Sequence, residues 1–114
     1  MKSFVDTNIF IYAQGRPHPC KEPSIKLLRQ IAQGDIDAVS SVEVGQELLY
    51  RYWLIKMPEA GFTILRHFLE IMGVLLPVAK PDLVLAGRLM QENLKLPPRD
   101  SLHAAVMLNH GITR

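Results

Sequence analysis

The chain has 114 residues, of which 48% are apolar and 21% charged, and its formal net charge is +2 at pH 7. This length suits one domain spanning residues 1–114, and the composition excludes a disordered chain and a coiled coil. The one cysteine, Cys20, excludes an internal disulfide and a zinc site made of several thiolates. The charge permits an anionic partner but is too small for a dedicated nucleic-acid-binding domain.

Neither a signal peptide nor a membrane span is predicted. Charged residues, Asp6 among them, interrupt the N-terminal segment too early for a signal peptide. Arg66, His67 and Glu70 interrupt the most apolar stretch, so no uninterrupted apolar run is long enough to cross a bilayer. We therefore expect a cytoplasmic protein that has no membrane partner.

Short apolar runs alternate with segments of helical periodicity along the chain. The apolar runs predict strands at residues 3–5, 36–39 and 74–78, and the beginning of another at 112–113. The segments of helical periodicity are 8–12 (a helix or a tight turn), 24–33, 41–57, 59–72, 81–95 and 100–110. This alternation predicts a three-layer α/β/α fold with a mainly parallel central sheet.

The predicted sheet is expected to lack its C-terminal strands. The sequence stops at Arg114, where the last predicted strand has only begun. In a parallel α/β sheet that strand commonly packs beside the first one. The strand at residues 3–5 is therefore expected to keep an exposed edge, which favours pairing with another chain.

Three acids lie where a parallel α/β sheet binds its ligands, at or near the carboxyl ends of strands. Asp6 directly follows the first predicted strand and either caps the next helix or serves a functional site. Glu47 lies in a helix that is apolar around most of its circumference, where a carboxylate is costly unless paired or metal-bound. Alternatively, Glu47 and Glu43, one turn earlier, both face water. Asp100 opens the last helix, as its N-cap or beside a core cleft.

Carboxylates without a neighbouring histidine or cysteine favour Mg²⁺ or Mn²⁺ over zinc. Such ions activate water and stabilise the oxyanions of a phosphodiester. The four histidines are dispersed and are interpreted as surface or core residues. His103 alone, one helical turn from Asp100, is a candidate to support one of the acids.

The three acids belong to an ordered set of motifs that resembles the PIN-domain ribonucleases. The sequence F-V-D-T-N at residues 4–8 resembles their opening strand, which ends in D-T-N. Ser41 stands six residues before Glu47, as in their second motif, and D-S-L-H-A-A at residues 100–105 resembles their third, D-x-x-x-A-A. The resemblance spans nearly the whole chain and is similar in style to the VapC-type toxins of toxin–antitoxin pairs.

This resemblance implies an endoribonuclease that depends on Mg²⁺ or Mn²⁺, acts on RNA and has a cognate antitoxin as partner. By position, Asp6, Glu47 and Asp100 would be the catalytic metal ligands. Neighbouring residues would orient the site, namely Thr7, Asn8 and Ser41. Glu43 is near enough to Glu47 to compete with it for the role of metal ligand.

Arg51 and Arg99 are each close in sequence to one of the acids and are candidates to bind RNA phosphates. The alternative is that both are ordinary solvated charges.

The chain departs from the family pattern at its C-terminus. The family usually carries a further Asp shortly after the strand that follows the third motif, and here the sequence ends first. We therefore expect a weak or inactive nuclease.

The second hypothesis is an inactive protein-binding module. The apolar helices over residues 41–73 carry aromatic residues that would bind an antitoxin segment or a second copy, as in a homodimer, or else pack in the core. Those considered are Tyr52, Trp53, Phe62 and Phe68. A receiver domain phosphorylated on Asp6 is disfavoured because the chain lacks a D-x-D pair or an acidic cluster beside the first strand.

Overall fold

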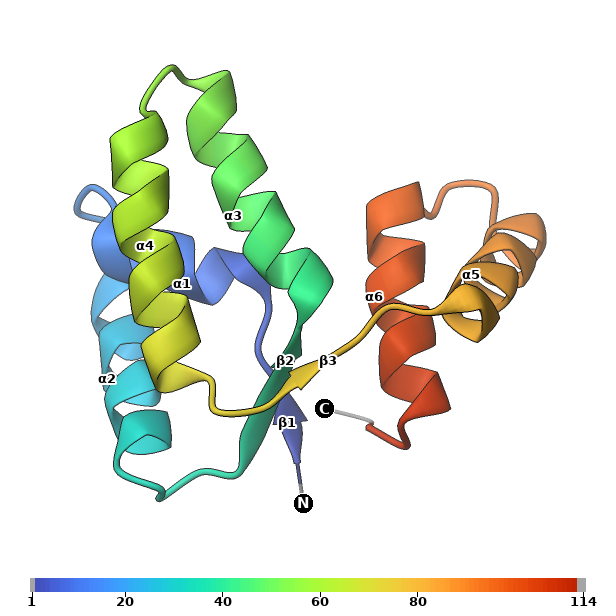
Figure 1. The fold of residues 1–114 in the computed structure, drawn as a ribbon, viewed down its shortest axis with the longest axis horizontal. Helices are drawn as coiled ribbons and strands as arrows, with labels where there is room; N and C mark the ends of the chain where they lie inside the picture. Colours follow the sequence, from blue (N-terminus) through green and yellow to red (C-terminus); the bar gives the residue numbers. More distant parts are fainter. Residues whose placement is uncertain (1, 113–114) are drawn as a thin grey trace.

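The computed structural model describes residues 2–112 and has a parallel sheet at its centre (Figure 1). Its strands are β1 (Ser3–Phe4), β2 (Ala38–Ser41) and β3 (Leu75–Leu76), in the order β1-β2-β3. Ser3 pairs with Ala38 and Ser40 pairs with Leu75, both in parallel register. All three strands therefore end at the same edge of the sheet.

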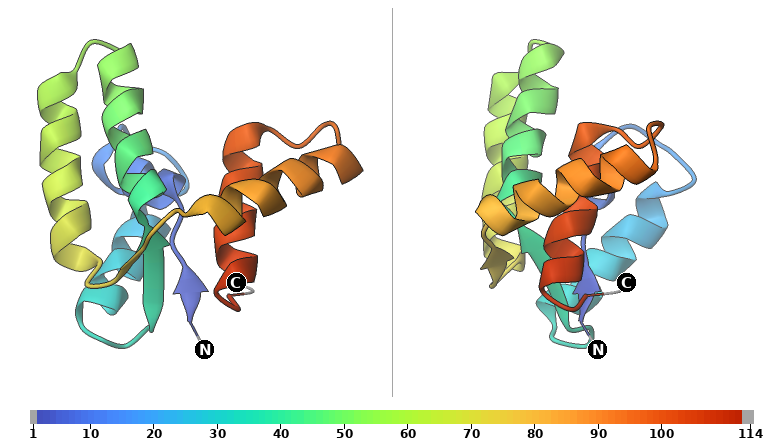
Figure 2. Two further views of the ribbon diagram at one scale, coloured as in Figure 1. Left: turned by 45° about the vertical axis from the view of Figure 1, so that its right-hand side comes forward. Right: turned by 90° about the vertical axis from the view of Figure 1, so that its right-hand side faces the viewer.

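Helices lie on both sides of these strands. Helices α1 to α4 lie on one side, and α5 and α6 lie on the other (Figure 1, Figure 2). Their bounds are α1 (Thr7–Gln14), α2 (Lys21–Ala32), α3 (Val42–Leu54), α4 (Pro58–Ile71), α5 (Lys80–Glu92) and α6 (Pro98–Asn109). The predicted three-layer α/β/α fold with a parallel sheet is thus confirmed. Across residues 2–112, no helix is long and apolar enough to span a membrane.

The main core lies between the sheet and helices α1, α3 and α4. Phe10 of α1 and Phe68 of α4 are buried and meet edge to face, with ring centroids 5.1 Å apart. Leu48 of α3 is fully buried in the same cluster. A Cβ atom at Gly61 of α4 would lie 2.9 Å from the Cβ of Tyr52. The close approach of α3 and α4 therefore depends on the missing side chain at residue 61.

The second strand lies two residues later than predicted, at Ala38–Ser41 instead of 36–39. The prediction followed the apolar residues and left out two serines. Both Ser40 and Ser41 are fully buried, and the Ser40 hydroxyl donates a hydrogen bond of 2.8 Å to the Val5 carbonyl oxygen. Because hydrogen bonds satisfy their polar groups, buried serines can occupy strand positions that apolar periodicity does not predict.

Several helices begin earlier than predicted, and prolines explain why. Helix α2 begins at Lys21, so Ser24 is buried inside it and does not cap it. Pro23 lies in its first turn, where the missing N–H breaks no helical hydrogen bond. Helix α6 likewise begins at Pro98, which puts Asp100 in the first turn and not at the N-cap.

Helix α3 ends at Leu54, three residues before its predicted end. Lys56 then adopts the left-handed region with φ of 59°, and Pro58 begins α4. A proline disfavours helical geometry at the residue before it, so the break starts ahead of the proline.

After α6 the described chain continues only to Ile112. This residue is buried and outside any strand, and its backbone N–H donates a hydrogen bond of 2.8 Å to the Met107 carbonyl oxygen. The rest of the predicted last strand lies outside the described residues. Within the described sheet, β1 is an edge strand.

Candidate functional site

Asp6 connects β1 to α1. It is exposed, it adopts extended backbone angles as the N-cap of α1, and its Oδ1 accepts a hydrogen bond of 2.6 Å from the Thr7 N–H. The helix-cap interpretation is therefore confirmed. The same position, at the carboxyl end of a parallel strand, keeps Asp6 a candidate for the functional site.

Glu47 lies in the second turn of α3 and is only 4% exposed, so the interpretation that it faces water is wrong. Its Oε1 receives a hydrogen bond of 3.2 Å from His103 Nε2 and lies 3.6 Å from Arg99 Nε. Its Oε2 lies 3.7 Å from Arg51 Nε. These partners supply the charge and the hydrogen bond that a buried carboxylate needs.

Asp100 lies in the first turn of α6, and its side chain is half exposed. Its Oδ1 lies 3.9 Å from Arg99 Nε. Because Arg99 also contacts Glu47, one guanidinium group connects the acids of α3 and α6. Arg51 and Arg99 therefore both lie near Glu47, and their binding of RNA phosphates stays a prediction.

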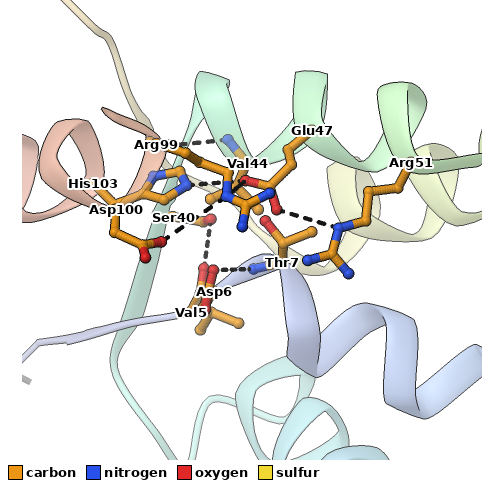
Figure 3. A network of polar contacts seen from close by, with 11 residues as sticks. Val5, Asp6, Thr7, Ser40, Val44, Glu47, Arg51, Arg99, Asp100 and His103 are labelled. Carbon is orange, nitrogen blue, oxygen red and sulfur yellow. Dashed lines mark hydrogen bonds and ion pairs between the residues drawn. The ribbon is translucent and has the colours of Figure 1, made fainter. Parts of the chain in front are cut away.

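The three acids come from separate parts of the chain and face the same region, beyond the carboxyl ends of β1 and β2 (Figure 3). Their carboxylates do not form a ready-made metal cluster. Considering residues 2–112, no group of three or more His, Cys, Asp or Glu side chains is close enough to hold an ion. The three acids implied as metal ligands therefore do not form a common binding group in this side-chain arrangement. The charged neighbours of Glu47 are instead Arg51 and Arg99.

The residues predicted to orient the site lie at the starts of α1 and α3. Ser41 is buried and caps α3, its Oγ accepting a hydrogen bond of 3.3 Å from the Val44 N–H. Asn8 and Glu43 are half-buried. Thr7 is fully buried, and its Oγ1 has no hydrogen-bond partner within the described part of the chain.

The donor chemistry of this region fits a hard divalent cation. Asp6, Glu47 and Asp100 offer carboxylate oxygens, the ligands that Mg²⁺ and Mn²⁺ prefer. The buried Thr7 Oγ1 is an unsatisfied polar atom in the same network. Leaving such a group unpaired costs about 1–3 kcal/mol, so a bound water in the site would stabilise it.

The contact of His103 with Glu47 is the one that the sequence indicated least clearly. His103 is buried on α6, and its ring lies 6.0 Å from the ring of Phe4. Its spacing from Asp100, one helical turn, was the available signal, because residues three apart share a helix face. Its partner is Glu47 and not Asp100.

The aromatic residues considered for partner binding have different environments. Phe68 belongs to the core, whereas Trp53 and Phe62 are exposed and line a groove of about 290 Å³. Tyr52 is half-buried, and burial raises the pKa of its phenol while the charge of Arg51 opposes this effect. Core packing therefore accounts for Phe68 but not for Trp53 and Phe62.

Known proteins resemble this chain along almost its whole length. The sequence model of the PIN domain matches residues 3–114. VapC ribonuclease Mb1869c of Mycobacterium bovis and ribonuclease VapC13 of Mycobacterium tuberculosis are each 36% identical to it, over 96% of the chain and 84% of the relative. Ribonuclease VapC23 of Mycobacterium tuberculosis is 35% identical, over 97% of the chain and 87% of the relative. No solved structure matches the chain significantly.

Proposed function

Because this chain belongs to the PIN-domain family, we propose that it is a metal-dependent endoribonuclease, the toxin of a toxin–antitoxin pair. Relatives that align with nearly all of it carry the name ribonuclease. The observation that carries the proposal is the burial of the Glu47 carboxylate beside the ends of β1 and β2. A buried acid of this kind is costly for stability alone, and a functional site explains its presence.

Asp6, Glu47 and Asp100 are the proposed catalytic acids and the residues that would hold Mg²⁺ or Mn²⁺. When bound, such an ion would lower the pKa of a water molecule and polarise the scissile phosphate. The chain's own groups prepare the site: His103 holds one oxygen of Glu47, and the Thr7 backbone N–H donates a hydrogen bond to Asp6.

The arginines are the proposed RNA contacts. Arg51 and Arg99 have side chains exposed by 35% and 50%, so a phosphate from solvent can reach them. Guanidinium groups bind phosphate oxygens with charge-assisted hydrogen bonds. Their place beside Glu47 would hold the RNA backbone over the acids.

The proposed partners follow from the same assignment. They are an RNA substrate in the cytoplasm, a cognate antitoxin protein and a second copy of the chain in a homodimer. The ribonuclease names of the relatives favour an active enzyme over an inactive binding module, and also over the weak or inactive nuclease expected from the sequence.

Cleavage of a single-stranded RNA by the purified chain tests the proposal. We expect cleavage with Mg²⁺ or Mn²⁺, none with EDTA, and a loss of at least about 100-fold in Glu47→Gln and Asp6→Asn, since even residues behind metal ligands cost 10–100-fold. Glu70→Gln, an exposed acid on α4, is the matched control and should keep full activity. Cleavage that survives EDTA or Glu47→Gln would contradict the proposal.

A further inference from the structure

Building on the proposed metal site, we propose that Arg99 and the divalent ion compete for one position. In this proposal the guanidinium group of Arg99 neutralises Glu47 when no ion is bound. An ion that binds Glu47 and Asp100 must displace this group from between the two carboxylates.

The distances place one cation between two proposed ligands. Arg99 Nε lies 3.6 Å from Glu47 Oε1 and 3.9 Å from Asp100 Oδ1 (Figure 3). An ion bound by these two oxygens would approach each of them to about 2.0–2.6 Å. The guanidinium group and the ion cannot occupy this space together.

The burial of the groups shows which of them can move. The Glu47 side chain is only 6% exposed, so leaving its carboxylate without a partner is costly. The Arg99 side chain is 50% exposed and extends from the first turn of α6. Its guanidinium group can therefore turn into solvent without disturbing the core. In solvent it is available to a phosphate.

Arg51 contacts the same acid in a different way. It lies four residues after Glu47 on α3, and its Nε is 3.7 Å from Oε2, the other carboxylate oxygen. The only ion pair found for it in the described part of the chain is this one. Arg51 thus neutralises Glu47 from the side and does not lie between two acids.

This difference makes Arg51 a matched control for Arg99. Removing either arginine removes one positive charge at nearly the same distance from Glu47, 3.7 or 3.6 Å. The electrostatic gain in metal affinity that acts through Glu47 is therefore similar for both variants, whereas Arg99 alone also contacts Asp100. Any additional gain in Arg99→Gln measures the release of the position that the ion needs.

Calorimetric titration of the full chain with Mn²⁺ tests the proposal. We expect Arg99→Gln to bind Mn²⁺ about three- to fivefold more tightly than the wild type, the range of a half-exposed ion pair. Arg51→Gln should gain at most about twofold. Thermal melting should show that Arg99→Gln without metal is less stable than the wild type and gains more on addition of Mn²⁺.

The proposed competition would be overturned if Arg99→Gln bound Mn²⁺ no more tightly than the wild type. It would also be overturned if Arg51→Gln gained as much Mn²⁺ affinity as Arg99→Gln. Glu47→Gln separates this failure from failure of the metal site itself. If the wild type binds Mn²⁺ and Glu47→Gln does not, the site stands and only the competition is tested by Arg99→Gln. If the wild type does not bind Mn²⁺, both proposals fall.

A measurement on the unmodified chain covers the case in which Arg99→Gln does not fold. Titration with Mg²⁺ can be followed through the side-chain Nε–H signals of the arginines by NMR. The signal of Arg99 should move as its contact with Glu47 is lost, and that of Arg51 should change less. An unchanged Arg99 signal at saturating Mg²⁺ would overturn the proposal.

Discussion

Asp82 connects the two helices on the side of the sheet that carries Asp100. It is buried in the first turn of α5, and its Oδ2 accepts a hydrogen bond of 2.8 Å from the Ala79 N–H. Its Oδ1 accepts another of 2.8 Å from Asn109 Nδ2, at the end of α6. We expect Asp82→Ala to destabilise the fold by loosening α5 from α6.

The magnitude follows from the two contacts that are lost. A side-chain contact that caps a helix N-terminus contributes about 1 kcal/mol. A hydrogen bond to a charged acceptor contributes about 1.5–3 kcal/mol when well shielded from water, and less near the surface. We therefore expect a loss of about 2–3 kcal/mol in the free energy of unfolding at pH 7, measured by urea denaturation and circular dichroism.

The effect should depend on pH in a defined direction. The hydrogen bond from Asn109 is the main cause that lowers the pKa of Asp82; the Ala79 contact and the charge of His110 lower it further, and burial opposes them. A carboxyl with a lowered pKa stabilises the fold fully above its unfolded value of about 3.9 and loses this contribution as pH falls through the folded value. The difference between wild type and variant should thus shrink below about pH 4.

Asp35→Ala is the matched control, because Asp35 is an exposed acid in the loop before β2. It should change stability by less than about 0.5 kcal/mol. A difference for Asp82→Ala that stays constant from pH 5 to pH 3, or that equals that of the control, would refute the reasoning.

Two further predictions concern packing and the support of Glu47. Gly61→Ala should destabilise the fold by about 1–3 kcal/mol, because its Cβ would lie 2.9 Å from that of Tyr52. Gly87→Ala in α5 places its Cβ in open space and should stabilise the fold by about 0.5–1 kcal/mol. Melting curves in which Gly61→Ala is the more stable of the two variants would contradict this. His103→Ala should weaken Mn²⁺ binding about 10–100-fold, because Glu47 loses its hydrogen bond, and His103→Gln should recover part of it. Unchanged Mn²⁺ affinity in His103→Ala would show that Glu47 needs no such support.

The sequence was sufficient for the fold because each element has a local signal. Helical spacing and proline or glycine breaks separate the helices, and short apolar runs mark the strands. Two of the candidate acids have a local signal for the same reason: Asp6 follows a strand, and Asp100 stands at the start of a helix. The shift of β2 came from Ser40 and Ser41, whose burial depends on hydrogen bonds that no apolar pattern encodes.

The partners of Glu47 could only be predicted in part. Arg51 is visible in the sequence as a neighbour one helical turn away. His103 is 56 residues away, and its contact exists only once the fold brings α6 near the start of α3. Arg99, also on α6, reaches Glu47 for the same reason. Long-range contacts of this kind depend on tertiary geometry, so one sequence cannot distinguish a buried, paired acid from one that faces water.

The central claim, that three acids of this chain hold a divalent ion for RNA cleavage, is tested most directly by locating the ion. A crystal structure of the chain grown with Mn²⁺ would reveal it through its anomalous scattering. We predict one or two ions with oxygens of Asp6, Glu47 and Asp100 at about 2.0–2.6 Å, and the Arg99 guanidinium group turned away from Glu47. A structure at saturating Mn²⁺ that shows no ion near these acids, or an ion that Glu47 does not bind, would contradict the account.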